Sequence, residues 1–259
     1  MEAHSAQNQE ESPLLAGSST VIISDLTNQE FLERYAQPGR VGLSGGKTWI
    51  DKVITRAERH LDDQERWGQW SHVFLFQGPR IDGHQWLVES DLQLERKHIR
   101  MGAQENRMSK YYDEELYSTL AILDFGLNDV QVPALLTEAL DLVANRHRYS
   151  LRELVGTLIA LRNPELRCEE NVLARERSMY CSAFVQYLFR KIEIDLAPGV
   201  HAKNSTPEDI WRSKLPRVAY VLQRPPLRTK IEAGRVRLRR RIKARVKSLK
   251  TRKNPPAAK

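Results

Sequence analysis

Three residues of this chain have side chains suited to covalent acyl chemistry: His72, Glu89 and Cys181. A thiolate is a strong nucleophile, but a thiol is weak while it stays protonated. A neighbouring imidazole can take the thiol proton, and a carboxylate bonded to that imidazole can fix its tautomer and orientation. We therefore consider Cys181 as a candidate nucleophile, His72 as its base and Glu89 as the group that orients the base.

A predicted β-hairpin brings two of these residues together. Residues 71–90 contain two short apolar runs, HVFLFQ and QWLVES, separated by the turn-forming sequence GPRIDGH. In a regular hairpin with Gln77 opposite His84, His72 faces Glu89. Side chains directly opposite each other in antiparallel strands share one face and lie close together. The pattern therefore predicts a contact between the imidazole and the carboxylate.

A predicted helix over residues 178–191 carries the third residue. Cys181, Phe184, Val185 and Leu188 form one apolar stripe, and Ser178 is a suitable N-cap. Cys181 then lies in the first turn, where the helix dipole and an adjacent imidazolium both favour a thiolate. Unpaired N–H groups of that turn are also able to stabilise an oxyanion.

Each of the three residues also has an ordinary structural interpretation. A cysteine on an apolar helix is commonly a small packing residue. His72 fits a hydrogen-bonded residue at a strand end, and Glu89 fits a solvent-facing one. The residue types alone therefore leave both interpretations open.

The motifs around the three residues resemble one family. Their order along the chain is similar to that of the YiiX/YaeF-type permuted branch of the NlpC-type papain-like superfamily, over roughly residues 37–215. The matching segments are Gln37-Pro-Gly, Trp-Ser-His-Val at 70–73, Val-Glu-Ser at 88–90, Tyr-Cys-Ser-Ala-Phe-Val at 180–185 and Thr206-Pro-Glu-Asp-Ile. In that family a histidine at a strand start, a polar residue on the next strand and a cysteine opening a later helix form the catalytic triad. The resemblance implies these roles for His72, Glu89 and Cys181.

The resemblance implies an α+β, circularly permuted papain-like fold, with an antiparallel sheet packed against helices and the nucleophile at a helix N-terminus. It implies a cysteine-dependent hydrolase that acts on an amide, isopeptide or (thio)ester bond through a Cys181 acyl-enzyme. Lecithin retinol acyltransferase-like proteins share the permuted arrangement, so a lipid acyltransferase is an alternative. The expected substrate is a peptide, an isopeptide or a lipid-acyl compound.

Other chemistry-bearing residues are less promising. Cys168 lies in a polar stretch without a nearby histidine, and no CxxC pair occurs. The remaining central histidines, at positions 60, 84, 98, 147 and 201, lack metal-ligand spacing. We expect no metal and no cofactor. The Tyr180 hydroxyl is a candidate for a place near the site, although core packing explains this residue equally well.

The flanking elements complete the predicted domain. Helical patterns cover residues 48–63, 131–146, 150–162 and 208–212, with strands at 117–125 and 217–223. The mixed order of elements itself predicts an α+β domain. The segment GLSGGKT at 42–48 resembles a phosphate-binding loop, but it has Val41 where that motif needs its first glycine, so we interpret it as a flexible turn.

Charge separates the body of the chain from its C-terminal tail. Residues 228–259 hold 14 Lys and Arg and one acid, and therefore carry +13, whereas the remainder carries −5 within the net charge of +8. Ile231, Leu238, Ile242 and Val246 recur at helical spacing within this tail. A basic amphipathic helix fits an anionic membrane or a nucleic acid, and a solvated tail is the plainer interpretation. A non-catalytic binding protein that docks through residues 228–259 is therefore the rival hypothesis.

These observations bound the organisation and location of the protein. We expect a disordered segment over residues 1–19, a catalytic domain over 20–223 and a basic, helical tail over 224–259. No signal peptide or apolar run long enough for a membrane span is evident. Only two cysteines occur, which suits a reducing compartment. We expect a cytoplasmic protein, with peripheral membrane contact as an option for the tail.

Overall fold

The structure is a computed structural model that describes residues 17–46, 49–61, 67–95, 98–146, 151–171, 173 and 179–224. The chain divides into two units, Met1–Leu222 and Gln223–Lys259, and the elements below belong to the first unit. The predicted disordered segment, residues 1–19, and the predicted basic tail, residues 224–259, fall mostly outside the described residues.

Seven strands form one mixed sheet within the described residues. Their order across the sheet is β1-β7-β6-β2-β3-β4-β5. The strands are β1 (Ser19–Ile23), β2 (Val41–Gly46), β3 (His72–Pro79), β4 (Gln85–Glu95), β5 (His98–Arg107), β6 (Tyr117–Asp124) and β7 (Val218–Leu222). All neighbouring pairs are antiparallel except β1 and β7, which run parallel. The prediction of an antiparallel sheet is therefore wrong at this edge, because the N-terminal strand pairs with the C-terminal one.

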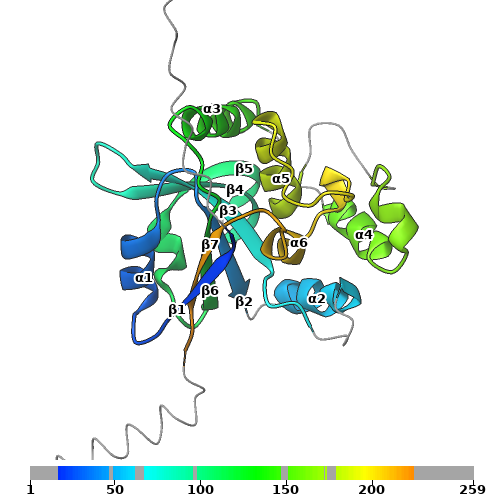
Figure 1. Cartoon of the computed structure of the whole chain (residues 1–259), viewed down its shortest axis with the longest axis horizontal. Coiled ribbons are helices and arrows are strands. Elements are labelled where there is room, and N and C mark those ends of the chain that lie inside the picture. Colours follow the sequence, from blue (N-terminus) through cyan, green and yellow to red (C-terminus); the bar gives the residue numbers. More distant parts are fainter. Residues whose placement is uncertain are drawn as a thin grey trace, which may run out of the picture. The chain divides into compact units, whose positions relative to one another are not determined.

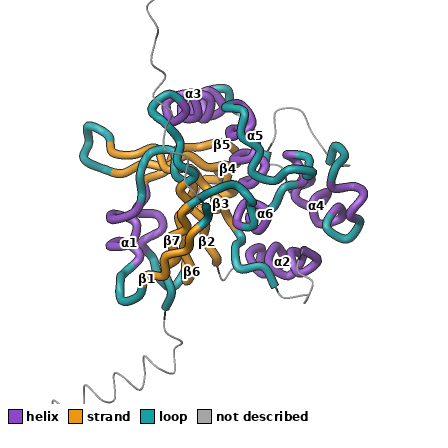
Figure 2. Tube along the Cα trace, viewed as in Figure 1, coloured by secondary structure: helices purple, strands orange, loops and turns teal. Residues whose placement is uncertain are grey.

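Six α-helices and four short 3₁₀ helices surround the sheet in the described part of the chain (Figure 1, Figure 2). The α-helices are α1 (Asn28–Tyr35), α2 (Trp49–Ala57), α3 (Gln131–Ala144), α4 (Leu151–Ala160), α5 (Cys181–Lys191) and α6 (Pro207–Trp211). The 3₁₀ helices are η1 (Glu58–Leu61), η2 (Met108–Tyr112), η3 (Pro164–Arg167) and η4 (Ala202–Asn204). Over the same described residues, no helix has the length and apolarity that a membrane crossing requires. The observed helices and strands give an α+β fold.

Strand alternation divides the core into two apolar clusters. Successive side chains of a strand point to opposite faces, so β3 contributes Val73 and Leu75 to one cluster and Phe74 and Phe76 to the other. The first cluster includes residues of α3 and α5, and the second includes residues of α1 and η2. α1 and α5 accordingly lie on opposite sides of the central strands in Figure 1. The start of β3 thus lies between two packed layers.

Residues 42–46 of the glycine-rich segment that we interpreted as a flexible turn belong to the strand β2, in the middle of the sheet, and residues 47 and 48 lie outside the described residues. β2 pairs with β3 on one side and with β6 on the other, with Gly42 opposite Phe74. A Cβ atom at Gly42 would lie 2.2 Å from Cε2 of the Phe74 ring. Gly42 is therefore needed because the Phe74 ring lies so close to its backbone. In the sequence alone, glycines in this segment looked like turn residues.

Replacing Gly42 with alanine is expected to lower the free energy of unfolding by about 1–3 kcal/mol, because the new methyl group overpacks the core against Phe74. Urea unfolding would measure the change. Gly17→Ala is the matched control, since nothing lies within 4 Å of a Cβ atom at that position. Equal stability of the two variants would contradict the expectation.

Candidate active site

Cys181 is the first residue of α5, and its side chain lies almost entirely inside the protein. The N-cap of the helix is Tyr180, whose side chain makes no capping hydrogen bond, so the prediction of Ser178 as the N-cap is wrong. The helix begins later than predicted, and this places the thiol at the first helical position. The first N–H groups of α5 have no acceptor within the helix, so they are free to stabilise an anion beside Cys181.

Buried hydrogen bonds hold the start of α5 in place. The Tyr180 hydroxyl donates to the backbone oxygen of Ser205 at 2.6 Å and lies 2.7 Å from Oγ1 of Thr157. Oγ of Ser182 donates to the same Ser205 oxygen at 2.9 Å. On the other side, Oγ of Ser90 donates to the backbone oxygen of Met179 at 2.5 Å. The Tyr180 hydroxyl therefore anchors the start of α5, and strand β4 supports the same segment.

His72 opens β3 and contacts Glu89 of β4, with 2.7 Å between Nε2 and Oε2. The register from which we predicted this contact is wrong. β3 and β4 pair Leu75 with Val88 and Phe76 with Leu87, so that the same register places Phe74 opposite Glu89. A bulge between Phe76 and Gly78 separates this register from the one near the turn. The predicted partner of Glu89, His72, and the observed one, Phe74, are two positions apart in β3. Because side chains alternate between faces with a period of two, His72 and Glu89 still lie on the same face.

Glu89 is completely buried and accepts hydrogen bonds at both of its oxygens. Oε2 accepts from the Tyr111 hydroxyl at 2.6 Å in addition to the His72 contact. Oε1 accepts from Nδ2 of Asn106 and from Nζ of Lys110, each at 2.6 Å. Burial opposes ionisation of Glu89, but the Lys110 charge and the His72 contact outweigh it and hold the pKa of Glu89 well below its usual value. The carboxylate is therefore ionised and fixed in orientation.

The charge state of His72 depends on the same neighbours. Burial disfavours its protonated form, but the charge of Cys181, hydrogen bonds to Cys181 and Glu89, and the charge of Asp91 together raise the pKa of His72 well above its usual value. Because Nε2 is engaged by Glu89, Nδ1 is the ring nitrogen left for the Cys181 sulfur. The three residues therefore form one chain of interactions, from thiol to imidazole to carboxylate.

His72, Glu89 and Asp91 also form a cluster with metal-ligating atoms, which lie within 4.8 Å of one another. Nζ of Lys110 lies 2.6 Å from Oε1 of Glu89 and 2.6 Å from Oδ2 of Asp91. An ammonium group thus already contacts both carboxylates, and a metal ion at this position would have to displace it. The positive charge of Lys110 therefore offsets the negative charge of the two carboxylates.

Sequence reasoning missed three of the residues around Glu89: Asn106, Lys110 and Tyr111. Asn106 is the last residue but one of β5, the strand next to β4, and its register position opposite Leu87 puts it on the same face as Glu89. Lys110 and Tyr111 belong to the 3₁₀ helix η2, which has no periodic sequence signal. A strand prediction for residues 98–107 would have found Asn106, whereas the two others depend on how η2 folds back.

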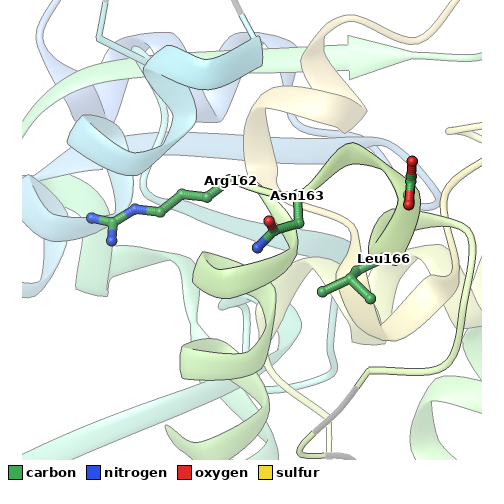
Figure 3. A pocket seen from close by; sticks show the side chains of 4 residues that line it. Arg162, Asn163 and Leu166 are labelled. Carbon is green, nitrogen blue, oxygen red and sulfur yellow. The ribbon is translucent and has the colours of Figure 1, made fainter.

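The structure describes only some of the other candidate residues. Cys168 is exposed and free. The side chain of His60 and all of His147 fall outside the described residues. A cavity of about 500 Å³ is lined by Arg162, Asn163, Glu165 and Leu166, at the end of α4 and in η3. Figure 3 shows the Arg162 and Leu166 side chains pointing in different directions from this turn, and the lining includes none of the three candidate catalytic residues.

Comparisons with known proteins give little further evidence. No protein-family model and no curated protein matches the chain. One solved structure, described as metalloprotein YiiX from Escherichia coli O157:H7 (DUF1105), is similar over 73% of this chain and 99% of that chain. The TM-score is 0.46 and the sequence identity 11%. A likeness at this level carries no argument about activity or metal content.

Replacement of Glu89 by glutamine is expected to lower the free energy of unfolding by about 3 kcal/mol at pH 7, because Lys110 loses its buried partner. The pKa of Glu89 is lower in the folded protein than its usual value of 4.5, so the stability that its charge contributes is present above pH 4.5 and is lost on acidification. Urea unfolding between pH 7 and pH 3 should therefore show that the free energies of unfolding of wild type and Glu89→Gln become more similar as the pH falls. A gap of constant size would contradict the expected ionisation of Glu89.

Proposed function

We propose that the protein is a cysteine-dependent hydrolase that acts on an amide, isopeptide or (thio)ester bond through an acyl-enzyme at Cys181. The observation that carries the proposal is the 2.7 Å contact of His72 with Glu89, and the influence of Cys181, which helps to raise the pKa of His72, supports it. These roles run in the chain order histidine, carboxylate, cysteine, as a circularly permuted papain-like enzyme requires. The two free cysteines suit a reducing compartment, and we include a cytoplasmic place of action in the proposal.

The first half-reaction forms a thioester. With His72 protonated, the Cys181 thiolate attacks the substrate carbonyl carbon, and the oxygen of that carbonyl takes the negative charge. The first-turn N–H groups of α5 stabilise the oxyanion. As the intermediate collapses, the bond to the leaving group breaks, and that group takes the proton from His72. The acyl group remains on the sulfur of Cys181.

The second half-reaction restores the enzyme. Neutral His72 accepts a proton from water while the water oxygen attacks the thioester carbon. Collapse of the second intermediate breaks the carbon–sulfur bond and releases the carboxylic acid and the Cys181 thiolate. Glu89 stays ionised throughout, orients the His72 ring and stabilises its positive form. An alcohol or amine in place of water would give acyl transfer, so the lipid acyltransferase alternative shares the intermediate and differs only in the acceptor.

The rival binding function concerns residues 228–259, which lie outside the described residues. Docking of this basic tail on an anionic membrane or a nucleic acid therefore stays a prediction from its sequence. It is compatible with catalysis by the body of the chain. The proposed substrate is a peptide, an isopeptide or a lipid-acyl compound.

Alkylation by iodoacetamide tests the activated thiol. In a Cys168→Ser background, Cys181 should react faster at pH 7 than a free model thiol, despite its burial. His72→Ala should lower the rate constant by on the order of 10²-fold, because the imidazolium that stabilises the thiolate is gone. Mass spectrometry of the modified cysteine gives the rate. A wild-type rate no higher than that of the model thiol would defeat the proposal.

Acylation tests the covalent intermediate directly. p-Nitrophenyl acetate should produce a burst of p-nitrophenol and an acetyl adduct at Cys181, followed by slow hydrolysis. Cys181→Ser should show neither burst nor adduct at that position, while Cys168→Ser should behave as wild type, since Cys168 is exposed and Cys181 is the cysteine that interacts with His72. An adduct found only at Cys168 would exclude Cys181 as the nucleophile.

A further inference from the structure

A second buried carboxyl group, Glu58, lies outside the Cys181–His72–Glu89 chain of interactions. Glu58 opens η1, and none of its surface is exposed. Its Oε1 accepts a hydrogen bond from the backbone N–H of Glu208 at 3.1 Å, whereas its buried Oε2 has no hydrogen-bond partner among the residues that the structure describes. A buried polar group without a partner is costly and calls for an explanation.

The surroundings of Glu58 favour its neutral form. Burial raises the pKa of Glu58 well above its usual value, and the charges of Glu208, Asp209 and Cys181 add to that effect, while the Glu208 N–H opposes it. The nearby cation, Arg212, is engaged by Glu208, with 2.8 Å between Nε and Oε1.

Glu58 and Glu208 both contact the backbone that leads into β3. Gly68 packs directly on Glu58, since a Cβ atom at Gly68 would lie 2.0 Å from Oε2 of Glu58. The Gly68 N–H donates to the backbone oxygen of Thr55 at 2.8 Å. The Gln69 N–H points to Oε2 of Glu208 at 3.4 Å. The segment is thus held between η1, the preceding helix α2 and α6.

The held segment ends at His72. Trp70 is fully buried, and its ring packs on Trp211 of α6 with 5.3 Å between centroids. The Ser71 N–H donates to the backbone oxygen of Ser44 in β2 at 3.0 Å. Residues 68–71 therefore connect the contact with Glu58 to His72, and each of them is packed or hydrogen-bonded. A shift at Gly68 has little room to be absorbed before it reaches His72.

We propose that Glu58 is a positioning residue that locks Gly68 and Gln69 between η1 and α6 and so fixes His72 relative to Cys181. The inference rests on the proposed function, because it assigns Glu58 a role through the catalytic histidine. The shape of the Glu58 side chain carries this role, because Gly68 packs directly on its carboxyl group and leads along the backbone to His72.

Three variants test the proposal through the rate constant of Cys181 alkylation by iodoacetamide at pH 7, in the Cys168→Ser background. Glu58→Gln keeps the shape of the side chain and should react within about twofold of the parent. Glu58→Ala and Gly68→Ala disturb the contact from its two sides and should each lower the rate about tenfold or more. Glu138→Ala is the control, because Glu138 lies on α3 and contacts Tyr187 rather than this segment.

A double-mutant cycle with His72→Ala separates positioning from general loss of structure. If Glu58 acts through His72, Glu58→Ala should lower the alkylation rate in the parent and leave it unchanged in His72→Ala. Equal losses with and without His72 would overturn the proposal, as would a Glu58→Gln variant as slow as Glu58→Ala. If Glu58→Ala does not fold, Gly68→Ala takes its place in the cycle. Failure of the proposed function would be seen separately, as an ordinary thiol rate in the parent protein.

Discussion

The buried negative charge of Glu89 is the constraint on which the rest of the site depends. Removing a carboxylate from water costs several kcal/mol, which a protein recovers only when every oxygen finds a well-placed donor. Here strand β5 contributes Asn106, η2 contributes Lys110 and Tyr111, and β3 contributes His72. These elements must all be in place before the charge is tolerated. The orientation of His72 is therefore as well defined as the packing of the sheet.

The same arrangement explains why the protonated form of His72, at the start of β3, is favoured. Glu89 and Asp91 supply negative charge near the imidazole, and Cys181 interacts with the same ring. Lys110 limits the excess of negative charge by contacting both carboxylates. Each part of the cluster thus compensates for another, and removal of one charge changes the state of the rest.

Sequence reasoning predicted the contact between His72 and Glu89 but not the strand register that brings it about. Short-range patterns identified β3, β4, β6, β7 and most helices, because apolar periodicity reports burial directly. The register of the hairpin could not be predicted, since the bulge beside Gly78 leaves no mark in the apolar pattern. The start of α5 was also missed: Tyr180 is held by Ser205 and Thr157, which are distant in sequence. Gly42 looked like a turn residue because the ring that requires it, Phe74, lies on another strand.

The parallel pairing of β1 with β7 has a consequence for synthesis of the chain. Ser19 pairs with Val218, so the first strand to leave the ribosome must wait for the last one, for about 10–40 s at ordinary translation rates of about 5–20 residues per second. Val21 and Ile22 remain partly exposed even after pairing. During translation the edge of β6 that β7 later covers is also open. Nascent chains with both edges unpaired are a target for chaperones and for aggregation until Leu222 has been made.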